Sequence, residues 1–205
     1  MEIISIRKYK GTTYETELDD GRKIYLHAEI IMDFNLRSGQ KVERDELRKI
    51  IYASNFRRAY QYALYKLDYR DYSVSEMLKT LIKTYKNESL CTAVTDKLVG
   101  IGVINDERYA EKLARKFVET KKFGYRRAKR EIMQKGIDIY IAEDALEPYS
   151  DVYTENIMHL LETKHARYLT DNGDRKSIEK VKNALIRYGY SYDEINRAVR
   201  EYFED

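Results

Sequence analysis

Basic residues gather in one stretch of this chain, between Lys112 and Arg130. The stretch holds nine lysines and arginines against one acidic residue, Glu119, which gives it a net charge of +8. The whole 205-residue chain carries only +3. Arginine binds carboxylate or phosphate groups through paired hydrogen bonds, whereas lysine attracts either as a point charge. The stretch therefore predicts contact with an anionic surface, either acidic protein or nucleic-acid phosphate.

The strongest candidates are the basic residues that the apolar pattern does not use. Between residues 125 and 135 an apolar stripe recurs at helical spacing: Tyr125, Ala128 and Ile132. On that helix Arg126, Arg127 and Arg130 fall on the opposite side, so we expect them to have no structural role. The predicted binding residues are Lys116, Lys121, Lys122, Arg126, Arg127 and Arg130. The alternative, a solvated helix face that only aids solubility, stays open.

Tyrosines form a second pattern in a chain that has 20 of them. Four follow one another at spacings of 3 or 4 residues: Tyr62, Tyr65, Tyr69 and Tyr72. Arg58 falls on the same side of the predicted helix, and Arg70 lies close by, so both are candidate contact residues. Aromatic rings beside arginine stack on nucleobases or anchor a protein contact. Packing of these rings against the N-terminal sheet or a neighbouring helical unit is the alternative.

Residue patterns for catalysis are missing from the sequence. His27 falls in a predicted strand, and His159 and His165 are six residues apart on one helix, a spacing that makes no metal pair. We find no zinc, phosphate-loop or nucleophile-elbow motif. The one cysteine, Cys91, sits in apolar register and predicts a small core residue. We expect no enzyme activity, no cofactor and no metal.

The first forty residues favour strands. Short β-type runs flank Leu18-Asp19-Asp20-Gly21, and Asp-Gly between two such runs is a strong hairpin signal. A small N-terminal hairpin or sheet followed by a short helix is therefore predicted for residues 1–50.

From residue 42 onward the chain is predicted to be helical, and it repeats itself. Blocks that open at Ser73, Gly124 and Ser177 each place apolar residues at their second, fifth and ninth positions. The last two blocks run to glycine stops at Gly136 and Gly189, and the first reaches a similar stop near Gly100. A further helix precedes each block, over residues 55–68, 106–120 and 153–169. Ser73…Glu76 and Ser191…Glu194 fit the capping box.

These patterns predict a mainly α fold in which three tandem three-helix repeats form an elongated array after the small N-terminal sheet. We place the repeats at residues 51–104, 105–150 and 151–205. A membrane span is not predicted, and the single cysteine fits a reducing compartment, so a cytoplasmic protein is expected. The sequence leaves the oligomeric state open, and a monomer is the simplest expectation.

Several stretches resemble the RecX regulatory proteins of bacteria. Residues 102–110, Gly-Val-Ile-Asn-Asp-Glu-Arg-Tyr-Ala, are similar to the family's "G-V-I-D-D-x-R-F/Y-A" motif, with Asn105 replacing its first aspartate. Residues 124–137 resemble "G-x-x-R-I-x-x-E-L-x-x-K-G-I", and residues 67–73 resemble "L-x-x-R-x-R-S", with Tyr72 in place of its second arginine. Leu18–Gly21 is similar to the hairpin of longer members.

The resemblance implies a non-enzymatic regulator of the RecA recombinase that binds RecA filaments on single-stranded DNA. It implies lowered strand exchange, ATP hydrolysis and repressor cleavage, or modulation in both directions in some members. It also implies direct DNA binding, single- or double-stranded, in several members. The family supplies no catalytic residues. Two other functions stay open: a DNA-binding module that acts mainly through phosphate contacts, and a helical scaffold for another protein.

Overall fold

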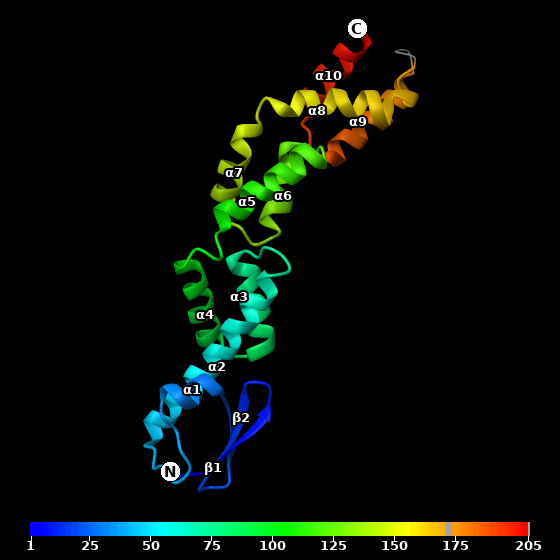
Figure 1. Ribbon diagram of the computed structural model, residues 1–205. Helices are drawn as coiled ribbons and strands as arrows, with labels where there is room; N and C mark the ends of the chain where they lie inside the picture. The colour runs from blue at the N-terminus through cyan, green and yellow to red at the C-terminus, as the bar shows by residue number, and fades with distance from the viewer. Residues whose placement is uncertain (171–173, 205) are drawn as a thin grey trace. The chain divides into compact units, whose positions relative to one another are not determined.

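The computed structural model describes residues 1–170 and 174–204. The chain divides into two compact units, of which unit 1 comprises Met1–Asp71 and Met77–Val103, and unit 2 comprises Tyr72–Glu76 and Ile104–Asp205. Unit 1 contains the sheet, and helices dominate both units (Figure 1). The predicted mainly helical fold with a small N-terminal sheet is confirmed.

The sheet of unit 1 is antiparallel, with strands β1 (Ile3–Lys10), β2 (Thr13–Leu18) and β3 (Lys23–His27) in sequence order. The predicted turn joins β2 to β3, and Gly21 adopts the positive φ of 79° that glycine tolerates best. One face of the sheet buries Ile3, Leu18 and Leu26 against α1 (Ala28–Asp33) and the next helix. That apolar face fixes the strand register.

The two halves of helix α2 (Arg44–Leu67) pack against different elements. Leu47 and Ile50, in its first half, join the apolar cluster under the sheet. Ala59 and Ala63, in its second half, are fully buried where α2 contacts α4 (Glu88–Gly100). The predicted start near residue 55 was therefore too late, because the first half packs on the sheet and follows a different face of the helix.

The end of α3 (Val74–Tyr85) corrects the predicted stop near Gly100. The first repeat reaches its αL residue at Lys86, with φ 52°, and Gly100 instead ends the following helix, α4. Lys86 thus occupies the place that Gly136 and Gly189 hold in the later repeats. Cys91 on α4 is fully buried, as predicted.

Unit 2 contains two further sets of three helices around one continuous core. The first set is α5 (Asp106–Arg115), α6 (Tyr125–Met133) and α7 (Ile139–Leu146). The second set is α8 (Val152–Leu160), α9 (Arg175–Tyr188) and α10 (Tyr192–Glu204). Their shared core includes Ala114, Ile132, Ile157, Leu185 and Ile195. Within unit 2, the two sets therefore bury their apolar faces against each other.

The first helix of each set in unit 2 continues into a π-helical turn. These turns are η1 (Lys116–Thr120) after α5 and η3 (Leu161–His165) after α8. Short 3₁₀ turns, η2 (Glu147–Tyr149) and η4 (Ala166–Tyr168), follow α7 and η3. The predicted helices over 106–120 and 153–169 are thus largely confirmed as continuous helical segments of mixed type.

Local capping sets several helix starts. Ser73 and Glu76 form the predicted capping box, with the Glu76 N–H 3.0 Å from the Ser73 Oγ. Ser191 and Glu194 form the other one. The predicted start at Ser177 is wrong by three residues, because Asp174 is the N-cap of α9 and accepts from the Ser177 N–H at 3.1 Å.

Candidate partner-binding surface

The N-terminus of helix α6 is held against the third repeat by backbone hydrogen bonds. Gly124 donates its N–H to the carbonyl of Tyr188 at 2.9 Å, and Arg126 donates its backbone N–H to Gly189 at 3.2 Å. A Cβ on Gly124 would lie 2.6 Å from the Gly189 carbonyl carbon. The start of α6 therefore lies directly on the loop that ends α9, and only glycine allows this approach.

Arg127 has structural contacts, so the prediction that all three arginines lack a structural role is wrong. Its guanidinium carbon lies 3.8 Å from the Phe123 ring centroid, and its Nη1 donates to the carbonyl of Arg187 at 3.1 Å. A Cβ on Gly189 would lie 2.4 Å from the Arg127 Cβ. Arg127 therefore fastens α6 to the end of α9.

The other predicted cations of unit 2 lie on η1, on the loop after it and on α6. Their charged ends have no hydrogen-bond or ion-pair partner within residues 1–170 and 174–204; the residues are Lys116, Lys121, Lys122, Arg126 and Arg130. All are exposed except Lys122, which is half-buried and whose carbonyl accepts from the Tyr190 hydroxyl at 2.7 Å. We call these five residues the cationic face.

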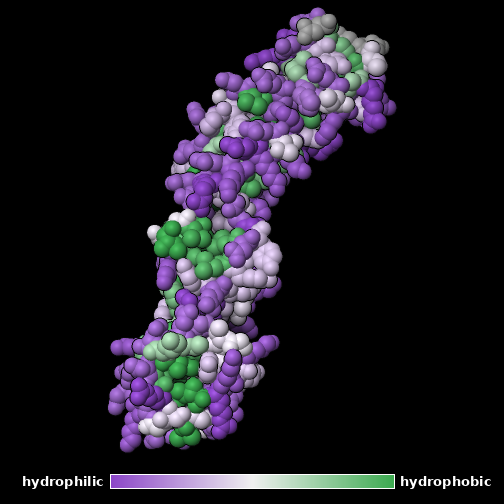
Figure 2. All heavy atoms as spheres, in the orientation of Figure 1, coloured by the Kyte–Doolittle hydropathy of each residue, from purple (hydrophilic) through white to green (hydrophobic). Residues whose placement is uncertain are grey.

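The neighbouring Lys129 shows what pairing looks like on the same helix. Its Nζ lies 2.8 Å from Glu143 Oε1 on α7, and this hydrogen bond raises the pKa of Lys129. Because the cationic face lacks such partners, its charges are available to an external anion. Figure 2 shows mainly hydrophilic side chains on the visible surface of unit 2. The arrangement suits carboxylate or phosphate binding.

The four predicted tyrosines do not form one helical stripe. Helix α2 ends at Leu67, so Tyr69 and Tyr72 lie beyond it, and Tyr72 belongs to unit 2. Tyr62 packs edge-on against Tyr85, with ring centroids 6.2 Å apart. Tyr65 and Tyr69 are 53% and 72% exposed, their ring centroids are 4.9 Å apart, and their hydroxyls are hydrogen bonded at 2.9 Å.

The two predicted arginines of this region differ in exposure. Arg58 is half-buried on α2 and donates from Nη2 to Asn55 Oδ1 at 2.8 Å, and its buried Nε has no partner in the part of the chain that the structure describes. Arg70 is exposed and donates to the carbonyl of Asp71. The binding roles of all these residues stay predictions.

Sequence reasoning missed an aromatic ladder on another side of α2. Tyr52, Phe56 and Tyr60 recur every four residues, and the rings of Phe56 and Tyr60 are stacked with centroids 6.4 Å apart. The Lys97 Nζ from α4 lies 4.9 Å from the Tyr60 ring centroid. The i, i+4, i+8 spacing of aromatic residues was the available signal.

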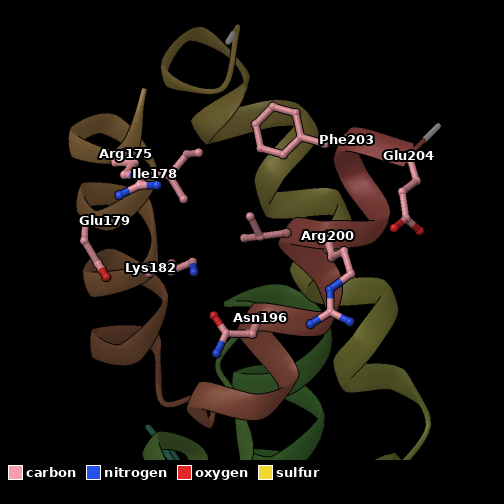
Figure 3. A pocket seen from close by; sticks show the side chains of 9 residues that line it. Arg175, Ile178, Glu179, Lys182, Asn196, Arg200, Phe203 and Glu204 are labelled. Carbon is pink, nitrogen blue, oxygen red and sulfur yellow. The ribbon is translucent and has the colours of Figure 1, made fainter. Parts of the chain in front are cut away.

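A cavity of about 580 Å³ lies between α9 and α10 (Figure 3). Its charged lining is mixed, with Arg175, Lys182 and Arg200 facing the same space as Glu179 and Glu204. None of the predicted binding residues lines this cavity. With both charge signs present, it presents no uniform field for an anion.

Within residues 1–170 and 174–204, no helix is both long and apolar enough to cross a bilayer.

Comparisons with known proteins agree on one family. A family model described as RecX, second three-helix domain, matches residues 105–146, and one described as RecX, third three-helix domain, matches residues 151–199. The "Regulatory protein RecX" of Clostridioides difficile (strain 630) is 28% identical over 186 residues, which cover 90% of this chain and 86% of that protein. The "Regulatory protein RecX" of Streptococcus sanguinis (strain SK36) is 28% identical over 198 residues, or 97% and 76% of the two proteins.

Solved structures give the same result. A crystal structure described as regulatory protein RecX matches the fold with a TM-score of 0.75 over 98% of both chains, at 24% identity. The crystal structure of RecX from Lactobacillus salivarius matches with a TM-score of 0.67 at 33% identity, over 73% of this chain and 97% of that one. Because almost the whole of that relative is matched at this identity, the chain belongs to the RecX family of regulatory proteins.

Proposed function

We propose that this chain regulates the RecA recombinase by binding RecA filaments on single-stranded DNA, without catalysing a reaction. Membership of a family of regulatory proteins supports a regulatory role. The observation that carries the proposal is the cationic face, because Arg126 and Arg130 extend from α6 without a partner in the described part of the chain. A filament of protein on DNA offers both carboxylates and phosphates to such side chains.

In this proposal α6 has two functions that its residues divide between them. Gly124 and Arg127 hold the helix on the third repeat, and Arg126 and Arg130 contact the filament. Because the helix backbone is already fixed, binding does not have to order it, and the entropic cost of the contact is smaller. The chain acts as a monomer and inhibits the filament by occupying its surface.

The test measures ATP hydrolysis by RecA on single-stranded DNA while this protein is added far below one copy per RecA. We expect inhibition at these ratios, because one molecule bound to a filament affects many RecA subunits. A molecule that only covers DNA would block no more than the stretch it occupies. The Arg126→Glu/Arg130→Glu double variant should lose most of it. Arg197→Glu/Arg200→Glu, with the same change of charge on exposed positions of α10, is the matched control and should inhibit normally.

The same cations support a second candidate, a DNA-binding module that acts mainly through phosphate contacts. Inhibition only when the protein approaches saturation of the DNA would favour this module over filament binding. Equal losses of DNA affinity and of inhibition in the Arg126/Arg130 variant would do the same. No inhibition at any ratio would contradict both and leave a helical scaffold for another protein.

A further inference from the structure

A hollow of about 410 Å³ on unit 1 combines aromatic and cationic side chains. It is lined by Tyr9 and Lys10 from β1, Thr13 from β2, Tyr25 from β3 and Arg58 from α2. All five residues belong to unit 1, so the hollow is separate from the cationic face. Only Arg58 was among the residues that the sequence singled out.

Two tyrosine rings form the aromatic part of the hollow. Tyr9 is 62% and Tyr25 is 39% exposed, and their ring centroids are 4.9 Å apart. The Tyr25 hydroxyl donates to Glu15 Oε2 at 3.1 Å, which fixes the direction of that ring. Exposed rings held in place present their faces to a flat ligand at a small loss of conformational entropy.

Two cations complete the hollow. Lys10 is exposed and has no partner within residues 1–170 and 174–204. The buried Nε of Arg58 also has none there, and a buried donor without an acceptor is unfavourable. An anionic oxygen in the hollow would lie beside two positively charged residues, because Lys10 and Arg58 both line it.

Glu15, the acidic group beside Tyr25, is already neutralised. Its Oε1 lies 2.9 Å from the Lys23 Nζ, and that hydrogen bond lowers the pKa of Glu15. Its charge therefore opposes an incoming anion less than a lone carboxylate would. Lys10 and Arg58 are the charged residues that line the hollow itself.

Aromatic and basic side chains continue from the hollow along α2. Tyr62 and Tyr65 follow Arg58 by four and seven residues, which places all three on one face of the helix. The Lys66 Nζ lies 5.3 Å from the Tyr62 ring centroid, and Tyr69 contacts Tyr65 just past the helix end. We call the set the tyrosine track; its members are Tyr9, Lys10, Tyr25, Arg58, Tyr62, Tyr65 and Tyr69.

We propose that the tyrosine track binds single-stranded nucleic acid, with a base against Tyr9 and Tyr25 and its phosphate at Lys10 and Arg58. Every base has a face that stacks on an aromatic ring, so rings interleaved with cations suit a strand of any sequence. In a duplex the base faces are covered, so the same rings have nothing to stack on. An acidic peptide would use the cations and leave the exposed ring pair without a role.

This contact needs no RecA and does not rest on the proposed regulation. The test therefore measures fluorescence anisotropy of a short labelled oligothymidylate with the full chain, in the absence of RecA. Tyr9→Ala should weaken binding about fivefold or more, the loss of one base stack. Tyr9→Phe should restore most of it because the ring is kept. Tyr140→Ala is the matched control, a single tyrosine removed from a 73% exposed position of unit 2, and should bind normally.

Two further measurements serve as controls for duplex binding and for folding of the variant. Affinity for a duplex of the same length should be unchanged by Tyr9→Ala, and circular dichroism should show that the variant is folded. Unchanged single-strand affinity in the folded Tyr9→Ala variant would overturn the proposal. Equal losses for single strand and duplex would also overturn it. A polyglutamate peptide whose binding depended on Tyr9 as strongly would instead assign the hollow to an acidic protein segment.

Discussion

The cationic face on unit 2 and the tyrosine track on unit 1 both suit anions, but they are built differently. On the cationic face the charges project from η1, the loop after it and α6, and α6 is fixed from behind by glycine contacts. On the tyrosine track the charges alternate with exposed rings that come from a sheet and a helix. Electrostatic contacts weaken as salt is added, whereas stacking depends little on salt. The two surfaces can therefore be distinguished by variants that separately disturb the packing behind α6, remove a charge or remove an aromatic ring.

Replacing Gly189 by alanine has the largest expected effect. It disturbs the contact that holds α6 in place and leaves the tyrosine track unchanged. The new Cβ would lie 2.4 Å from the Arg127 Cβ, at a residue whose φ is +97°. The free energy of unfolding of unit 2 should fall by roughly 2–4 kcal/mol. Urea unfolding followed by circular dichroism measures it.

Gly11→Ala is the control for this variant. Gly11 also has a positive φ, +52°, but nothing lies within 4 Å of its missing Cβ. We expect a loss of only about 1 kcal/mol from backbone strain. Equal losses at both positions would mean that the contact with Arg127 adds nothing.

Removing a ring and removing a charge should give different salt dependences of single-strand affinity. Tyr9→Ala should weaken binding about fivefold at every salt concentration, with an unchanged slope of log affinity against log salt. Arg126→Gln should lower that slope by about 0.7, because one phosphate contact is lost, and its effect should fade at high salt. Titrations over a series of salt concentrations provide both values. If Tyr9→Ala changed the slope as much as Arg126→Gln, the two surfaces would use the same chemistry.

Neighbouring arginines on α6 should differ in their effect on stability. Arg127→Ala removes the stacking on Phe123 and the hydrogen bond to Arg187, so unfolding should become easier by about 1–2 kcal/mol. Arg126→Ala removes a side chain without a partner in the described part of the chain and should change stability by less than about 0.5 kcal/mol. Urea midpoints compare the two variants. A larger loss for Arg126→Ala would reverse the assigned roles.

The smallest expected effect comes from the hydroxyl of Tyr65. Its hydrogen bond with the Tyr69 hydroxyl is exposed to water, so Tyr65→Phe should leave thermal stability almost unchanged. Single-strand affinity should also be preserved, because stacking uses the ring. Anisotropy titration of Tyr65→Phe beside Tyr65→Ala checks this. If the phenylalanine variant lost as much affinity as the alanine variant, the track would act through hydroxyls.

Local signals predicted much of the fold because they depend on neighbours in sequence. The Asp-Gly turn at Gly21 and the capping boxes at Ser73 and Ser191 each need only a few adjacent residues, and the structure contains all three. The stop of the first repeat was missed because its αL residue is Lys86 and not glycine. The local signal that remained was Asn87, which directly follows Lys86 and is the N-cap of α4.

The difference between Lys86 and its counterparts has a physical cause. A Cβ on Gly136 would lie 2.5 Å from the Ser75 Cβ, and one on Gly189 would meet Arg127. Lys86 is exposed, so a side chain is tolerated there. Glycine was thus required by close tertiary neighbours, which are not visible in sequence.

The candidate site was less predictable than the fold for the same reason. Helical periodicity correctly placed Arg126 and Arg130 away from the core, but it does not show that the α9 end loop reaches Arg127. The ring pair of Tyr9 and Tyr25 depends on the meeting of two strands that are not adjacent in the sheet. Contacts between distant elements therefore limited the prediction, whereas charge density was readable from composition.

The π-helical turns η1 and η3 have a consequence for comparing this chain with its relatives. In a π turn the backbone hydrogen bond spans one residue more than in an α-helix, so each turn holds an extra residue inside an otherwise continuous element. A relative with a plain α-helix at this point would be one residue shorter in the middle of a helix. Alignments that allow gaps only in loops would then shift every residue between the π turn and the next loop. Insertions and deletions in this family should accordingly be sought within the first helix of the second and third repeats as well as between repeats.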